Sequence, residues 1–279
     1  YINKEKLQVA ASISKSDLCS DLVSEYPELQ GVMGKYFALS QGFEEDIANS
    51  VSDHYLPVGL TSSLPKKPFS YSVSIVDKID SLIGFYLINE KPTSSKDPFA
   101  LRRAAIGLLR IIIENKLYLK LSDLLNYSIK LYEEQGVILQ NRNSEIQVLD
   151  YLKERMRNIF KLKNIKPDII EASINAHKGD NFLDLYKKTM LINKHINKEI
   201  GANVVNTYKR AANILFKANV KIIGRPDAVL FRKDEEKLLY DKINEIRKAF
   251  TTKETNKDYE DLLIKLSELK SLLIIFLTM

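Results

Sequence analysis

Two adjacent arginines, Arg102 and Arg103, stand at the start of a predicted helix and could bind phosphate. They follow a polar loop in which Asp97 can accept backbone N–H bonds as an N-cap, and Pro98 suits the first helical position. The positive end of the helix dipole disfavours cations there. Their placement indicates a role beyond helix stability, and with Lys96 they form the first group of candidate phosphate ligands.

Two carboxylates, Asp77 and Asp80, lie one turn apart on a strongly apolar predicted helix. Paired carboxylates can bind a divalent metal ion or carry out acid–base chemistry. They can also neutralise the following basic helix, on which Arg103 and Arg110 share a face. We favour this structural role, with ion pairs to Arg102, Arg103 or Arg110, because an unpaired buried charge is very costly.

A second basic group lies on a helix predicted over residues 202–218, after a turn at Gly201. Lys209 and Arg210 are adjacent, and Lys217 lies seven residues beyond Arg210 on the same face. Apolar residues lie between them. A helix that packs on one side and meets phosphate on the other has this pattern, and so does a helix with a solvated face.

Signatures of a catalytic or metal centre are absent from the sequence. The three histidines, His54, His177 and His195, are far apart, and none belongs to a Cys/His pair with zinc-ligand spacing. The glycines are scattered singly and form no phosphate-binding loop. We therefore predict no catalytic residue, no metal site and no cofactor bound by this chain.

The composition is that of an ordinary soluble chain, with 45% hydrophobic and 28% charged residues. At 279 residues it is long enough for two domains. Its one cysteine, Cys19, excludes an internal disulfide and favours a cytoplasmic location. No stretch reaches the roughly 20 apolar residues that span a bilayer, so we expect no membrane partner.

Charge is distributed unevenly along the chain. Residues 1–90 hold 7 Lys/Arg and 12 Asp/Glu, whereas residues 91–279 hold 35 and 24. A basic two-thirds is typical of a protein with a polyanionic partner such as nucleic acid. A lysine-rich solvated surface would give the same balance.

Helical periodicity dominates, and signals for β-hairpins are absent. The strongest segments are residues 71–88 and residues 98–117, of which the second is apolar almost all round and should be buried. In the first, the apolar residues at helical spacing are Val73, Val76, Ile79, Ile83 and Leu87. With a linker at residues 163–166, we predict an all-α fold in two domains, 1–165 and 166–279.

Several long motifs occur in one order along the chain. They are EYPELQGVMG at residues 25–34, HYLP at 54–57, DKIDSLIG at 77–84, PTSSKDPFALRRAAIG at 92–107 and KRAANIL at 209–215. These motifs resemble the signature of the bacterial glycyl-tRNA synthetase beta subunit. The resemblance covers almost the whole chain, and its motifs are very specific.

The resemblance implies an α2β2 ligase that joins glycine to tRNA with ATP. In that family the alpha subunit forms the adenylate and the beta subunit binds tRNA, so ATP and Mg are used by the holoenzyme through the alpha subunit. It also implies that residues 1–165 form a helical domain like that of HD phosphohydrolases. Residues 166–279 would begin a helical anticodon-binding-like domain that is truncated.

The partners implied are tRNA(Gly) and the glycyl-tRNA synthetase alpha subunit. Such contacts would position tRNA by charge without base specificity. The candidate tRNA-binding residues are Lys96, Arg102, Arg103, Lys209, Arg210 and Lys217.

Two other functions stay open on the sequence alone. An HD-type metal-dependent phosphohydrolase would need a metal site built from His54, Asp77 and Asp80. A purely structural module would dock the alpha subunit, and that role can coexist with tRNA binding.

The chain departs from the family pattern at its C-terminus. Where the family continues with Ser-Pro-Ile-Asp-Asn-Phe-Phe-Asp-Asn, residues 271–279 read SLLIIFLTM. Deleting one C from codons for the family pattern produces this tail, so we hypothesise a single-base frameshift in the gene or in its recorded sequence. It would remove the last helices of the domain and expose the apolar run 272–277. Resequencing the locus checks this, and an intact frame would contradict it.

Overall fold

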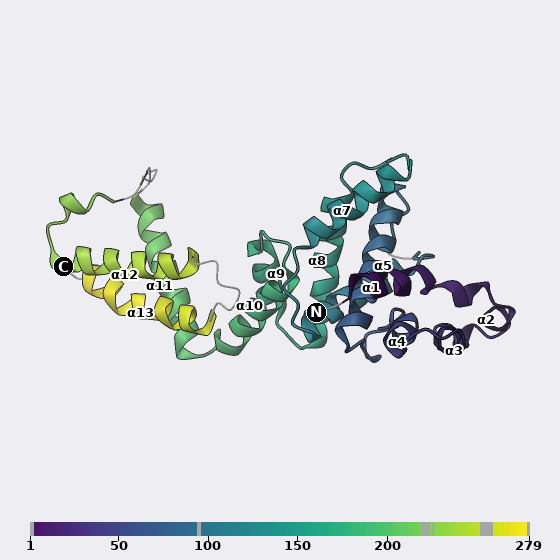
Figure 1. Cartoon of the computed structure of the whole chain (residues 1–279). Coiled ribbons are helices and arrows are strands. Elements are labelled where there is room, and N and C mark those ends of the chain that lie inside the picture. The colour runs from purple at the N-terminus through teal and green to yellow at the C-terminus, as the bar shows by residue number, and fades with distance from the viewer. Residues whose placement is uncertain (1–2, 94–95, 219–223, 225, 252–258, 278–279) are drawn as a thin grey trace. The chain divides into compact units, whose positions relative to one another are not determined.

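The computed structural model describes residues 3–93, 96–218, 224, 226–251 and 259–277 (Figure 1). Every regular element in these ranges is a helix, which confirms the all-α class. None of the helices in the described ranges is long and apolar enough to cross a membrane. The likeness of the two halves to HD and anticodon-binding domains stays a prediction.

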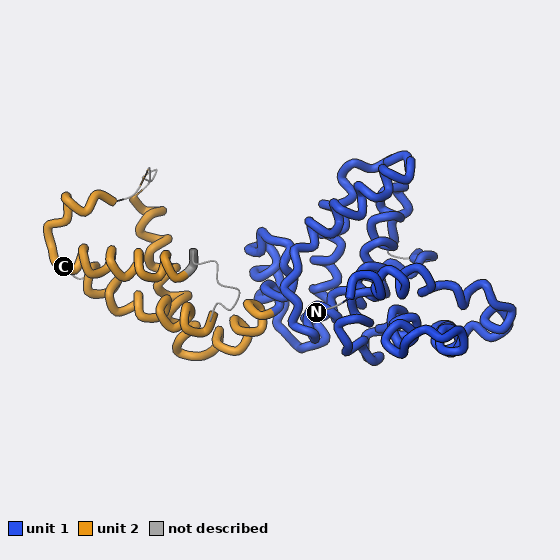
Figure 2. Tube along the Cα trace, in the orientation of Figure 1, with its two compact units in different colours: residues 1–186 blue, residues 187–279 orange. Residues whose placement is uncertain are grey.

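The chain divides into two compact units, residues 1–186 (unit 1) and residues 187–279 (unit 2) (Figure 2). Three short 3-10 helices accompany the α-helices; they are η1 (Ser16–Cys19), η2 (Pro27–Leu29) and η3 (Ala228–Leu230). The α-helices are α1 (Lys4–Ile13), α2 (Asp21–Glu25), α3 (Val32–Ser40), α4 (Glu45–Asp53), α5 (Pro68–Leu87), α6 (Leu101–Glu114), α7 (Leu121–Glu134), α8 (Ser144–Leu162), α9 (Pro167–Ala176), α10 (Phe182–His195), α11 (Glu199–Ala218), α12 (Asp234–Thr251) and α13 (Tyr259–Leu277).

The division falls later than the domain boundary predicted after residue 165. Beyond that residue the chain packs back on unit 1, since α9 contacts α8. At the start of α10, Phe182 and Leu183 are almost completely buried, and the ring of Tyr186 stacks on Phe160 at a centroid distance of 6.1 Å. Apolar burial therefore keeps this segment in unit 1.

Helices α5 and α6 form the centre of unit 1. Helix α5 packs against α4, α6, α7 and α8, and α6 also packs against α8. Side chains such as Leu82, Leu109 and Ile111 are completely buried there. Burial of a side chain of this size stabilises the fold by about 1.5–3 kcal/mol. Of the five apolar positions predicted on one face of α5, four are buried and Val76 is exposed.

Helix α6 begins at Leu101, three residues after the predicted start at Pro98, and it ends three residues before the predicted end. Ala100 adopts a left-handed conformation with φ 55°, which a right-handed helix cannot include. Asp97 still caps the helix, because its carboxylate accepts hydrogen bonds from the backbone N–H groups of Leu101 at 2.8 Å and Arg102 at 3.0 Å.

In unit 2, α13 packs against both α11 and α12 (Figure 1). Near its end Ile274, Ile275 and Phe276 are exposed. Exposure was predicted for the whole apolar run 272–277, and the structure has three of its six residues exposed and three partly buried.

The corner between α10 and α11 is a close approach of two backbones. The turn between the helices lies at residues 196–198. The prediction of a turn at Gly201 is therefore wrong, because this residue lies inside α11. A Cβ atom on Gly201 would lie 2.3 Å from the carbonyl oxygen of His195 and 2.6 Å from Cα of Ile196. Only glycine fits at this position without backbone movement.

The substitution Gly201→Ala should therefore lower the free energy of unfolding by about 2 kcal/mol, because the added methyl group overlaps backbone atoms. Urea denaturation followed by circular dichroism measures the change. Gly59→Ala is the control, since a Cβ atom there meets nothing within 4 Å. Equal stability of the two variants would contradict the close approach.

Candidate functional site

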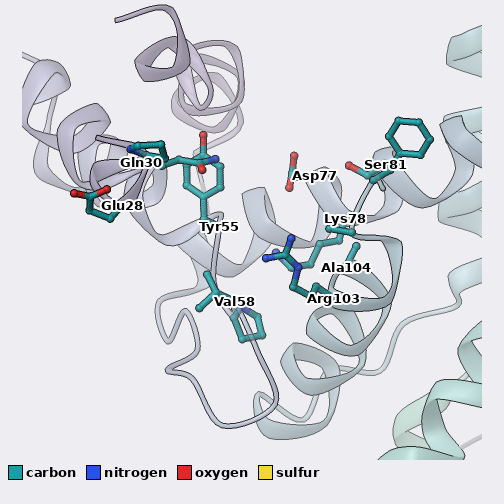
Figure 3. A pocket seen from close by; sticks show the side chains of 13 residues that line it. Glu28, Gln30, Tyr55, Val58, Asp77, Lys78, Ser81, Arg103 and Ala104 are labelled. Atoms are coloured by element: carbon teal, nitrogen blue, oxygen red, sulfur yellow. The ribbon is translucent and has the colours of Figure 1, made fainter. Parts of the chain in front are cut away.

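A cleft of about 520 Å³ opens on unit 1 beside α5 and α6 (Figure 3). Asp77 and Lys78 of α5 and Arg103 of α6 form one side of it, and Gln30 and Tyr55 lie opposite (Figure 3). The lining residues come from four separate stretches of the chain. These stretches coincide with the four N-terminal motifs that carry the family resemblance, so the fold gathers those motifs at one place.

Lys78 is the buried cation behind this cleft, with 5% of its surface exposed. Its ammonium group donates hydrogen bonds to the carbonyl oxygen of His54 at 3.0 Å and to Oγ of Ser74 at 2.8 Å. The hydroxyl group of Ser74 in turn donates to the carbonyl oxygen of Leu56 at 2.8 Å. The cation thus lies at the C-terminal, negative end of α4, where a positive charge is stabilised. Burial nevertheless lowers the pKa of Lys78 to about 8.

Gly107 makes room for the Lys78 side chain on the facing surface of α6. A Cβ atom on Gly107 would lie 2.8 Å from Cε of Lys78 and 3.3 Å from Cδ of Pro57. Glycine inside a helix costs about 1 kcal/mol relative to alanine. The close passage of the lysine stem explains why a glycine stands there.

Lys78 is not among the site residues predicted above, although the sequence carries a signal for it. In the pattern of α5, position 78 falls on the buried face that also carries Ile75, Ile79 and Leu82. A lysine on the apolar face of a central helix must find oxygen partners, and is therefore a candidate for a special role.

The ion pairs predicted between the α5 carboxylates and the α6 arginines do not form in the described structure. Asp77 pairs with Lys15 at 2.5 Å, because it faces the connection after α1. Asp80 is exposed and lies beside Tyr132, whose hydroxyl donates to the Asp80 carbonyl oxygen at 3.4 Å and whose pKa is raised by burial and by the Asp80 carboxylate. These carboxylates are thus not the partners of the arginines.

Arg110 also has partners other than those predicted. Its guanidinium group pairs with Glu114 one turn later at 3.4 Å. It also donates to the carbonyl oxygen of Gly59 at 2.6 Å, which ties α6 to the loop before α5. Its partners therefore come from its own helix and from a distant loop, and not from the α5 carboxylates.

The adjacent arginines at the start of α6 have different surroundings. The guanidinium group of Arg102 donates to the carbonyl oxygen of Thr93 in the preceding loop. Arg103 is exposed, lines the cleft and makes no ion pair with any described residue. Lys96 is exposed in the loop, where its backbone N–H donates to Oγ1 of Thr93 at 3.1 Å. Of the three, Arg103 is the one directed into the cleft.

The second basic group lies entirely in unit 2. Lys209, Arg210 and Lys217 are all exposed on α11, and none makes an ion pair with another residue of the described ranges. Tyr208 and Phe216 on the same helix are exposed as well. This half of α11 therefore presents cations and aromatic rings to the solvent.

The residues considered for a metal site do not converge. His54 is completely buried, with Nδ1 2.7 Å from the carbonyl oxygen of Val51, and its Nε2 has no hydrogen-bond partner among the residues that the structure describes. Burial lowers the pKa of His54, which favours the neutral ring. Asp77 is occupied by Lys15. Among the described residues no group of three His, Cys, Asp or Glu side chains could hold a metal ion.

The cap at the start of α6 gives a first test of the site. Replacing Asp97 by alanine should lower the free energy of unfolding by about 1 kcal/mol, because two backbone N–H groups lose their acceptor. Asp97→Asn keeps one oxygen and should lose less. Urea denaturation measures both variants, and an Asp97→Ala protein as stable as the wild type would contradict the cap.

The buried ammonium gives a second test, which depends on pH. An ordinary lysine has a pKa of 10.5, whereas that of Lys78 is lowered to about 8. Between these values the unfolded chain binds a proton that the folded chain does not, so stability rises with pH across the window. Relative to Lys78→Met, the wild-type protein should gain about 3 kcal/mol between pH 8 and 10.5.

Chemical denaturation at several pH values measures this difference. The other lysines are present in both proteins and cancel. Curves of unfolding free energy against pH that run parallel would contradict the burial of a charged Lys78.

The chain is similar to known proteins along most of its length. A family model described as glycyl-tRNA synthetase beta subunit matches residues 1–175. Proteins named glycine–tRNA ligase beta subunit from Rickettsia canadensis (strain McKiel) and Rickettsia africae (strain ESF-5) are each 39% identical over 267 residues, which is 96% of this chain. One of the same name from Rickettsia prowazekii (strain Madrid E) is 38% identical over 264 residues. The chain spans 38% of the length of these relatives.

Proposed function

Because the chain belongs to the glycyl-tRNA synthetase beta-subunit family, we propose that it binds and positions tRNA(Gly) for ATP-dependent glycylation by the alpha subunit. The observation that supports this most directly is a set of exposed cations that have no carboxylate partner in the described structure. Among them are the candidate residues Arg103 in unit 1 and Lys209, Arg210 and Lys217 in unit 2, and the last three lie together on α11.

Such cations contribute more to phosphate binding than to the stability of the fold. An exposed lysine or arginine with no partner contributes little to stability, but each one that neutralises a phosphate releases a condensed counterion. Contacts of this kind position the nucleic acid without reading its sequence. Within residues 91–279, lysine and arginine also outnumber aspartate and glutamate. This net positive charge attracts a polyanion such as RNA.

The proposal assigns the chemistry of glycylation to the other subunit. The holoenzyme would use ATP and Mg through the alpha subunit, and this chain would supply RNA binding in the cytoplasm. Its partners are then tRNA(Gly) and the glycyl-tRNA synthetase alpha subunit. Docking of the alpha subunit on this chain is compatible with RNA binding.

The unit 2 cations give the test of this proposal. The double variant Lys209→Gln/Arg210→Gln removes two phosphate contacts. The slope of log K for a tRNA(Gly) transcript against log salt concentration should become shallower by roughly 1.4–1.8, measured by filter binding between 50 and 200 mM salt.

The control variant is Lys4→Gln/Arg142→Gln, which removes the same charge from two exposed residues of unit 1 that make no ion pair in the described structure. Its slope should stay at the wild-type value. If the wild-type chain does not bind the transcript at low salt, the proposed function is wrong.

A further inference from the structure

We propose that the α5–α6 cleft of unit 1 is a binding site for one nucleotide, with the phosphate group on Arg103 and Lys78 and the base against the aromatic rim. The nucleotide would come from bound RNA or from a free nucleoside monophosphate, which share this chemistry. Where RNA is the source, the inference rests on the proposed function and deepens it.

Two cations from adjacent helices line the same side of the cleft. Lys78 of α5 and Arg103 of α6 both belong to its lining, and Figure 3 shows them on the side opposite Gln30 and Tyr55. Arg103 has no carboxylate within ion-pair distance in the described ranges, so its guanidinium group is available to bind an anion. A guanidinium group binds phosphate with two parallel hydrogen bonds.

Lys78 lies behind Arg103 and is held in place. An ammonium group has three N–H donors, and two of them are used by the oxygens of His54 and Ser74. No carboxylate of the described residues lies within ion-pair distance of this charge, although only 5% of the residue is exposed, and Asp77 acts on it at longer range. A phosphate oxygen would supply a third acceptor and a negative charge in direct contact with the ammonium group, which stabilises a buried cation.

The carboxylates that line the cleft do not prevent an anion from binding at its α5–α6 side, where Lys78 and Arg103 lie. Asp77 is already neutralised by Lys15 at 2.5 Å. Glu28 lines the far side, next to Gln30 and away from Arg103 (Figure 3). An anion is therefore drawn toward the α5–α6 side and repelled from the opposite one.

An aromatic rim indicates a nucleotide and not a bare anion. The ring of Phe99 lines the cleft with 43% of the residue exposed, and it is fixed by stacking on Phe85 at 4.0 Å and 17°. Tyr55 lies opposite, and the Gln30 amide offers both a donor and an acceptor to a base edge. Bases stack readily on such rings. A cleft of about 520 Å³ is also the size of a small-ligand site.

The first arm of the test uses RNA. Arg103→Gln should weaken binding of a tRNA(Gly) transcript about tenfold and make the salt slope shallower by about one unit, because one phosphate contact is lost. Arg142→Gln is the matched control, an exposed arginine of unit 1 that does not line the cleft. Phe99→Ala should weaken binding without changing the salt slope, which separates stacking from charge.

The second arm uses AMP and inorganic phosphate, titrated into the same proteins by isothermal calorimetry. AMP binding that Arg103→Gln abolishes identifies a free-nucleotide site, even if the wild-type chain fails to bind tRNA and the proposed function is wrong. An Arg103-dependent tRNA affinity without AMP binding identifies RNA as the source.

The inference is overturned if Arg103→Gln and Arg142→Gln match the wild type with both ligands, while tRNA binding itself persists. That outcome leaves the proposed function standing. Circular dichroism of each variant checks that the helices are intact, and Arg103 is exposed, so its replacement does not disturb the core.

Discussion

The buried ammonium group of Lys78 is the constraint on which the arrangement of unit 1 depends. A charge removed from water must be met by oxygen atoms. Here one oxygen is the carbonyl oxygen of His54, at the end of α4, and the other is the hydroxyl oxygen of Ser74. The Ser74 hydroxyl group in turn donates a hydrogen bond to the carbonyl oxygen of Leu56. On the other side, Gly107 lets α6 approach the lysine stem. One cation therefore fixes α4, α5 and α6 relative to one another, and the cleft lies where they meet.

The start of α6 combines an electrostatic cost with its compensation. Two arginines lie in the first turn, at the positive end of the helix dipole. The Asp97 carboxylate offsets this by accepting hydrogen bonds from the first N–H groups. Arg102 then turns back to the carbonyl oxygen of Thr93 and holds the loop, while Arg103 remains directed into the cleft. Of these two adjacent arginines, Arg102 therefore has a structural role, whereas Arg103 is available to a ligand.

Local patterns in the sequence predicted the long helices α5, α6 and α11, most of the buried face of α5 and the capping role of Asp97. They missed features that depend on distant parts of the chain. The partner of Asp77 is Lys15, sixty-two residues earlier, and no spacing rule within α5 and α6 identifies it. The left-handed Ala100, which delays α6, lies in a sequence that also suits a helix. The cleft itself could be predicted only as a set of family motifs, because its walls come from four separate stretches.

The most direct measurement is amide hydrogen–deuterium exchange of the chain with and without a tRNA(Gly) transcript. If the cleft held by Lys78 and the exposed half of α11 both contact RNA, bound transcript should slow exchange at residues 99–104 and 208–217, while α7 exchanges at an unchanged rate. Exchange that stays unchanged in both segments when the transcript is bound would contradict the account.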